Sequence, residues 1–203
     1  MKIALCVPSH DMVHMGFAKS LANLTAHLAS QGIEHVPCYG HGTVIPDVRL
    51  DIAQYALKSN AEYLMWLDSD MHFPRSTVNR LLEHNKEIVA ATYSTRVNPQ
   101  RSVAFMDQYD HDKRLIAKTG LHRVYAVGMG CMLVHRDVFT TLPQPWFQHI
   151  WNADTLNFSG EDIHFCKLAG EHGYNVFIDV DLSNDVAHYG TKAYLLKETD
   201  ESR

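Results

Sequence analysis

The chain has 203 residues, of which 46% are hydrophobic and 20% are charged, and its formal net charge is −5. These values are ordinary for a globular protein of one domain, and they supply enough apolar material for a core without a disulfide or metal staple. The negative balance argues against a surface dominated by contacts with nucleic-acid backbones.

The first ninety-two residues alternate between strand and helix patterns. Short apolar runs predict buried strands over residues 2–7, 33–39, 63–67 and 87–92. Apolar residues at helical spacing predict helices between them, over residues 17–28, 47–58 and 74–85. This alternation predicts an α/β fold with a doubly wound, mostly parallel central sheet.

The pattern changes after residue 95. Residues 96–121 are polar and predict either short antiparallel strands or a mobile loop, which could fold over a ligand as a lid. Strands are expected over 124–127, 131–134 and 176–180, and a helix over 162–171. We therefore expect a small antiparallel addition, one domain over residues 1–190, and a charged tail over 191–203 that frays.

Three features bear on the cellular compartment. Cys6, Cys38, Cys131 and Cys166 form no C-x-x-C pair, and buried free thiols are expected. The apolar run after Met1 is short and lacks the basic start of a signal peptide. No stretch approaches the roughly 20 apolar residues of a membrane helix. These features predict a soluble, cytoplasmic protein without a transmembrane segment.

Two carboxylates follow the third predicted strand, at Asp68 and Asp70. Open α/β sheets bind ligands at the carboxyl ends of their strands. Carboxylates two residues apart repel each other unless a cation or solvent separates them, and Mg²⁺ or Mn²⁺ bridges such groups to substrate phosphates. The pattern predicts a metal–diphosphate anchor; a plain acidic loop is the alternative.

Two further motifs carry candidate chemistry. Glu161 and Asp162 stand where a helix begins, so Asp162 is either a helix cap or a carboxylate that deprotonates a hydroxyl group. His188 follows the last predicted strand. Its imidazole is either structural or a further ligand for Mn²⁺ beside carboxylates.

The order of these motifs resembles that of the GT-A-fold glycosyltransferases, especially glycosyltransferase family 2 and its small bacterial and phage relatives. The resemblance extends from residue 2 to residue 190. It rests on Pro8-Ser9-His10, D-S-D at 68–70, G-M-G-C-M-L-V at 128–134, G-E-D at 160–162, and H-Y-G at 188–190. Each motif is short, and their common order is what makes the resemblance specific.

The resemblance implies a role for each matching position. Asp70 is expected to ligate Mn²⁺ or Mg²⁺ directly, Asp68 to contact the ribose or the metal, and His188 to complete the coordination. Asp162 is the expected general base of an inverting reaction, with Glu161 as the less favoured choice. The implied nucleotide-sugar-binding residues are Pro8, Ser9, His10, Arg49, Asp68, Ser69, Gly128, Met129, Gly130 and Trp151.

Two of these assignments have structural alternatives. Arg49 either approaches the nucleotide or is a solvent-exposed helix cation. The aromatic residues Trp146, Phe147 and Trp151 either stack on a sugar face or pack on the core. Gly128 and its neighbours are expected to let the backbone approach the donor sugar or acceptor closely.

The implied function is the metal-dependent transfer of a sugar from a nucleotide-diphosphate donor, with UDP favoured, to an acceptor hydroxyl. The acceptor is a glycan, a lipid-linked sugar, a protein or a modified nucleobase. No Q-x-x-R-W motif is present, which favours a single transfer over processive synthesis. A retaining outcome, a non-catalytic nucleotide-sugar-binding module and a sugar nucleotidyltransferase stay open. The last usually needs a Gly-rich loop, which Pro8-Ser9-His10-Asp11 does not supply.

Overall fold

The computed structural model describes residues 1–108, 110, 112–153, 156–190 and 193–195. The expected charged tail over 191–203 therefore lies outside the described residues, apart from 193–195. Cys6, Cys38, Cys131 and Cys166 are free and buried, as predicted. Among the described residues, no helix has both the length and the apolar character needed to span a membrane.

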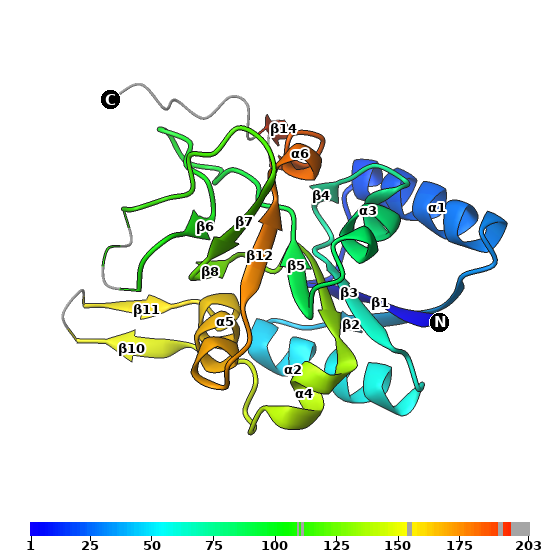
Figure 1. The fold of residues 1–203 in the computed structure, drawn as a ribbon, viewed down its shortest axis with the longest axis horizontal. Helices are drawn as coiled ribbons and strands as arrows, with labels where there is room; N and C mark the ends of the chain where they lie inside the picture. Colours follow the sequence, from blue (N-terminus) through cyan, green and yellow to red (C-terminus); the bar gives the residue numbers. More distant parts are fainter. Residues whose placement is uncertain (109, 111, 154–155, 191–192, 196–203) are drawn as a thin grey trace.

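A seven-stranded sheet forms the centre of the molecule (Figure 1). Five of its strands run in the same direction and two run opposite to them. In spatial order the strands are β2 (Glu34–His41), β1 (Lys2–Ser9), β3 (Tyr63–Leu67), β9 (Cys131–His135), β5 (Ile88–Ala90), β12 (Val176–Asp179) and β7 (Leu121–Val124). The two reversed strands are β9 and β7, so the predicted mostly parallel α/β sheet is confirmed.

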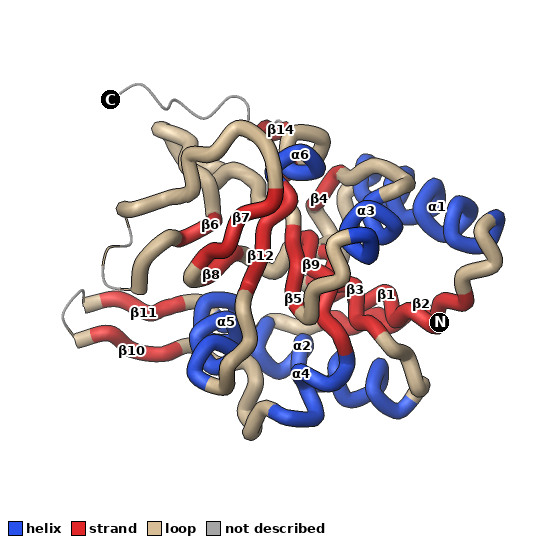
Figure 2. The backbone as a smooth tube through the Cα atoms, viewed as in Figure 1, coloured by secondary structure: helices blue, strands red, loops and turns tan. Residues whose placement is uncertain are grey.

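Helices cover both faces of this sheet, as Figure 2 shows. One hydrophobic cluster joins the sheet to α2 (Ile45–Lys58), α4 (Arg136–Thr141) and α5 (Glu161–Glu171). The other joins it to α1 (Met15–Ser30), α3 (Thr77–Glu83) and α6 (Val180–Ser183). Residues on parallel strands alternate between the two faces, which is why β1 sends Ala4 and Cys6 into the first cluster and Ile3 and Leu5 into the second.

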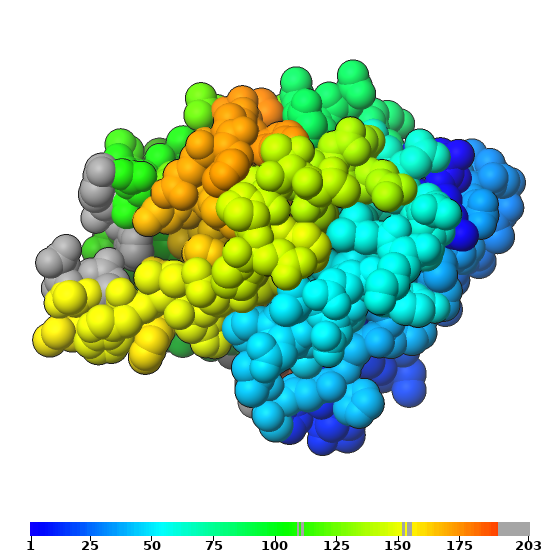
Figure 3. All heavy atoms as spheres, turned by 90° about the horizontal axis from the view of Figure 1, so that it is seen from below, coloured from blue at the N-terminus to red at the C-terminus, as the bar shows by residue number. Residues whose placement is uncertain are grey.

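Three small antiparallel sheets complete the fold. The first pairs β6 (Ala104–Phe105) with β8 (Ala126–Val127), and the second pairs β10 (Ile150–Asn152) with β11 (Asn157–Ser159). In the third, β13 (Ala187–Tyr189) is the central strand and pairs with both β4 (Met71–His72) and β14 (Ala193–Leu195). The β10–β11 hairpin, yellow in Figure 3, projects from one end of the molecule. The β4–β13 pair matters most, because its register sets His188 opposite Met71, the residue after Asp70.

Several local predictions need correction. The helix predicted over 74–85 begins at Thr77, because residues 74–77 form a turn closed by a bond from Thr77 N–H to Pro74 O. The strand expected over 131–134 corresponds to β9, which lies within the central sheet between β3 and β5 and runs antiparallel to both. Helix α4 and the β10–β11 hairpin were not predicted, because both are short and lack a clear period.

Candidate active site

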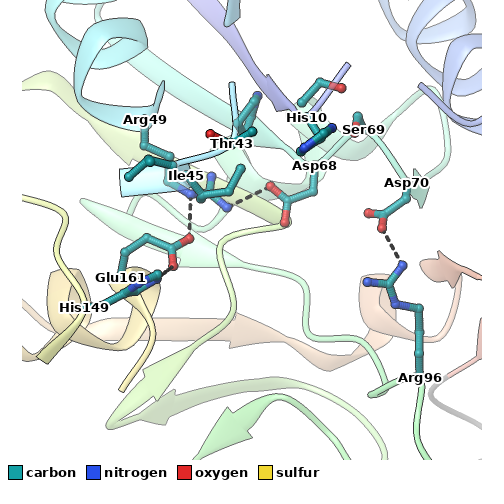
Figure 4. Close-up of a pocket in the computed structure, with 13 residues that line it drawn as sticks. His10, Thr43, Ile45, Arg49, Asp68, Ser69, Asp70, Arg96, His149 and Glu161 are labelled. Carbon is teal, nitrogen blue, oxygen red and sulfur yellow. Dashed lines mark hydrogen bonds and ion pairs between the residues drawn. The ribbon is translucent and has the colours of Figure 1, made fainter. Parts of the chain in front are cut away.

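A cavity of about 630 Å³ opens at the carboxyl ends of β1 and β3. These strands are parallel neighbours, so Pro8-Ser9-His10 and Asp68-Ser69-Asp70 emerge at the same edge of the sheet. Arg49, Arg96, His149 and Glu161 contribute to the remaining walls (Figure 4). Eight residues predicted to bind the nucleotide sugar, the metal or the acceptor proton therefore line one cavity: Pro8, Ser9, His10, Arg49, Asp68, Ser69, Asp70 and Glu161.

Arg49 links the two acidic motifs across this cavity. It extends from α2 and is only 3% exposed, which excludes the alternative of a solvent-exposed helix cation. Its Nη2 lies 2.8 Å from Asp68 Oδ1, and its Nε lies 3.0 Å from Glu161 Oε1. Figure 4 shows the guanidinium between the two carboxylates. The single positive charge of Arg49 thus pairs with two carboxylates. The Nη1 atom of Arg49 has no hydrogen-bond partner among the described residues.

The environment of Arg49 explains the ionisation of its partners. Burial on its own favours the neutral guanidine, but the carboxylates of Asp68 and Glu161 outweigh it and raise the pKa of Arg49. Burial raises the pKa of Asp68, and Arg49 only partly offsets this effect. Burial acts on Glu161 in the same sense, yet Arg49 and the helix N-terminus hold the pKa of Glu161 below its usual value.

Asp70 faces cationic or imidazole groups from two separate segments. Its Oδ2 lies 3.4 Å from His188 Nε2 and 2.9 Å from Arg96 Nη1. Burial opposes ionisation, but the hydrogen bond and charge of His188, together with Arg96, lower the pKa of Asp70. Arg96 is the first residue of the segment proposed as a lid, and it reaches into the cavity.

His188 is oriented by its second ring nitrogen. Nδ1 lies 3.2 Å from the carbonyl oxygen of Ser94, which can only accept a hydrogen bond, so Nδ1 carries a proton. In the neutral imidazole, Nε2 then presents its lone pair to Asp70, a pairing that needs either a second proton or a cation between the two groups. This is the arrangement by which protein carbonyls orient metal-binding histidines.

The carboxylate of Asp70 and the imidazole of His188 are side chains of the kinds that bind Mg²⁺ or Mn²⁺ in proteins. Among the described residues, no three His, Cys, Asp or Glu side chains are grouped closely enough to hold an ion. The expected trio of Asp68, Asp70 and His188 is thus reduced to Asp70 and His188, because Asp68 is bound to Arg49. Mg²⁺ and Mn²⁺ are commonly held by one or two protein ligands, with phosphate oxygens and water completing the shell.

Asp162 and Glu161 are adjacent but differ in environment. Both lie in the first turn of α5, whose N-cap is Gly160, so Asp162 is not the helix cap. Glu161 also lies 3.3 Å from His149 Nε2, while Asp162 makes no ion pair with any described residue. Burial, followed by the charge of Glu161, raises the pKa of Asp162 to about 6. The pKa of Asp162 thus lies closer to neutral pH than that of a free aspartate, which suits a general base.

The remaining predicted site residues lie elsewhere. Gly128 and Gly130 leave room for Tyr93 rather than for a sugar, since a Cβ on either glycine would lie 2.5 or 2.7 Å from Tyr93 Oη. Met129 between them is fully buried. Trp146 and Phe147 pack against Phe139 and are part of the core, so of the two alternatives left open for them, packing on the core holds. Trp151 lines a second cavity.

Five residues that line the cavity were not predicted from the sequence: Thr43, Val44, Ile45, Arg96 and His149. Arg96 lies in a polar segment without periodicity, and His149 is one of the chain's 14 histidines and belongs to none of the motifs. Only the tertiary structure brings them to Asp70 and Glu161, so no local signal could have identified them.

No protein-family model matches the sequence, and no curated protein matches it by sequence. Solved structures with the same fold include the following two. A197 from STIV is 16% identical, with a TM-score of 0.65 over 98% of this chain and 92% of that one. The catalytic domain of Drosophila β1,4-galactosyltransferase 7, in complex with xylobiose, is 17% identical, with a TM-score of 0.53 over 99% of this chain and 68% of that one. The chain therefore has the α/β fold of a GT-A-type glycosyltransferase.

Proposed function

We propose that this protein is a metal-dependent glycosyltransferase that moves a sugar from a nucleotide-diphosphate donor to an acceptor hydroxyl. The observation that carries the proposal is the contact between Asp70 and His188 at the rim of the sheet. Asp70 lines the cavity at the carboxyl ends of β1 and β3, the edge at which α/β sheets bind nucleotides, and the oriented imidazole of His188 lies against it. Glu161, at the start of α5, lines the same cavity.

Donor binding divides between two sets of residues. Pro8, Ser9 and His10 line the same cavity and are assigned to the nucleoside, for which we favour uridine. Asp70 and His188 would hold Mn²⁺ or Mg²⁺ at the diphosphate, where the ion neutralises charge on the leaving nucleoside diphosphate. Arg96, which forms an ion pair with Asp70, adds a second positive charge to this end of the cavity.

Proton transfer is assigned to Asp162. Its carboxylate takes the proton of the acceptor hydroxyl while that oxygen attacks the anomeric carbon from the face opposite the leaving group. The bond to the nucleoside diphosphate breaks in the same step, so the anomeric configuration inverts, as in single-displacement glycosidases. Glu161 is the poorer base because its charge is already engaged by Arg49 and its pKa is lowered.

The test compares the wild-type protein with Asp162→Asn. Nucleotide sugars are screened with Mn²⁺ by thermal shift, since a bound ligand raises apparent stability, and transfer is measured as release of nucleoside diphosphate. We expect Asp162→Asn to keep the thermal shift and to lose at least 100-fold in turnover. Binding without turnover in the wild type would favour a non-catalytic module, and release of inorganic diphosphate would identify a nucleotidyltransferase. Normal turnover by Asp162→Asn would refute the base assignment.

A further inference from the structure

A second cavity, of about 450 Å³, lies between helix α5 and the β10–β11 hairpin. Figure 1 shows the hairpin and the helix side by side, with the hairpin pointing away from the central sheet. Its walls include Trp151, Tyr125, Ile163, His164, Lys167 and Glu171. The cavity has the size of an ordinary small-molecule site and mixes aromatic, aliphatic and polar groups.

Trp151 is the dominant aromatic group of this cavity. The chain has three tryptophans; Trp66 and Trp146 are buried in the core, while Trp151 is 51% exposed. Phe158 lies directly opposite Trp151 in the hairpin register and contacts it edge to face, with ring centroids 5.1 Å apart. This contact fixes the indole in place, although exposure of so large an apolar ring costs free energy in water.

The polar groups around Trp151 come from one face of α5. Lys167 and Glu171 form an i,i+4 pair at 3.9 Å, and more than half of each side chain is exposed. His164 Nε2 lies 3.3 Å from both the Pro145 carbonyl and the Gln148 amide. The cavity thus offers hydrogen-bond donors and acceptors at its edge and a flat apolar ring at its wall. Sugar rings need this combination, because they are apolar on a face and carry hydroxyl groups around the rim.

The position of the cavity connects it to the proposed chemistry. Ile163 lines the second cavity, and its backbone N–H donates to the carboxylate of Asp162. Glu161, which precedes Asp162, lines the first cavity, the one that contains Asp68 and Asp70. The first turn of α5 therefore lies between the two cavities. Because α5 is a continuous helix, a ligand held along its outer face has a fixed position relative to Asp162.

We propose that this second cavity is a carbohydrate-binding site in which a sugar ring stacks on Trp151. On the basis of the proposed function, it is the acceptor subsite, and the acceptor class is a glycan rather than a lipid, a protein or a nucleobase. Lys167 and Glu171 bind hydroxyl groups at the rim of the same ring.

The first experiment measures sugar binding without donor or metal. Intrinsic tryptophan fluorescence and acrylamide quenching are followed while a panel of methyl glycosides and disaccharides is added to the full-length protein. Because Trp151 is the exposed tryptophan, a bound sugar is expected to protect its emission from the quencher at least twofold. Isothermal titration calorimetry, which does not depend on the Trp151 fluorophore, should show weaker binding of the same sugar to Trp151→Phe, which keeps a flat ring, and no binding to Trp151→Ala. Tyr55→Ala, at an exposed aromatic on α2, is the matched control and should bind normally.

The second experiment separates this site from the proposed function. With a sugar that binds and an active donor, Trp151→Ala should raise the acceptor KM at least tenfold, whereas the control Tyr55→Ala should leave the acceptor KM unchanged. Transfer by the wild type with an unchanged acceptor KM in Trp151→Ala would overturn the subsite and leave the proposed function standing. Sugar binding that depends on Trp151, without transfer from any donor, would overturn the proposed function and leave the carbohydrate site standing. Failure of every sugar to bind would overturn the site itself.

Discussion

Asp70 and His188 meet at the rim of the central sheet, with 3.4 Å between Oδ2 and Nε2. The backbone builds this contact: β13 pairs with β4 so that His188 faces Met71, and the N–H of Tyr189 donates to the carbonyl of Asp70 at 2.7 Å. The two side chains are thus brought together by strand register. This is the kind of rigid placement that a cation site needs.

Removal of the Arg49 guanidinium should destabilise the fold. Arg49→Met leaves Asp68 and Glu161 without their buried partner, and breaking such a pair costs about 3–5 kcal/mol. Urea denaturation measures the free energy of unfolding. Lys167→Met is the matched control, because its exposed pair with Glu171 contributes about 0.5 kcal/mol or less. An Arg49→Met protein as stable as the wild type would show that the guanidinium does not hold these carboxylates together.

The pH dependence of the rate should reflect Asp162. A general base acts in its deprotonated form, so kcat/KM should fall about tenfold per pH unit below the pKa of about 6. Above that pH the rate should level off until another group titrates. A profile measured between pH 4.5 and 8.5 checks this. An acidic limb centred near pH 4 would instead assign the base to an unperturbed carboxylate.

Asp162 should also lower stability at neutral pH. Its folded pKa of about 6 lies above the value of about 3.9 in an unfolded chain. The unfolded state therefore releases its proton first, and the stability that the protonated group contributes is lost as the pH rises from about 4 to 6. Asp162→Asn should accordingly raise the Tm at pH 7.5 relative to wild type and change it less at pH 4. Equal Tm differences at the two pH values would contradict the raised pKa.

Gly130 should not tolerate a side chain. A Cβ at this position would lie 2.7 Å from Tyr93 Oη, and the Gly130 N–H donates to that oxygen at 3.1 Å. Overpacking of this kind costs about 1–3 kcal/mol. Gly170→Ala is the control, since nothing lies within 4 Å of its Cβ position on helix α5 and alanine favours the helix. Thermal unfolding should show a lower Tm for Gly130→Ala and an equal or higher Tm for Gly170→Ala.

Local patterns were sufficient to predict much of the fold and the acidic motifs. Strand β3 is a continuous apolar run, so its bounds and the position of Asp68 after it follow from the sequence alone. The helix predicted over 17–28 corresponds to α1, which ends just before Gly32, where a φ of 67° favours glycine.

Non-local pairing could not be predicted in this way. The position of β9 between β3 and β5 depends on strand order, which a single apolar run does not encode. The burial of Arg49 depends on Asp68 and Glu161 arriving from different segments. The sequence around Trp146 and Trp151 does not indicate which of the two is buried. In the structure Trp146 packs against Phe139 in the core, whereas Trp151 is exposed.

The most direct test of the account is the effect of Mn²⁺ on nucleoside diphosphate binding, measured by isothermal titration calorimetry with UDP and GDP. We expect one of the two to bind at least tenfold more tightly with Mn²⁺ than with a chelator, and this gain to disappear in Asp70→Asn and His188→Ala. His172→Ala, at the exposed end of α5, should keep it. Equal affinities with and without Mn²⁺ in the wild-type protein would contradict the central claim that Asp70 and His188 bind a cation at the diphosphate.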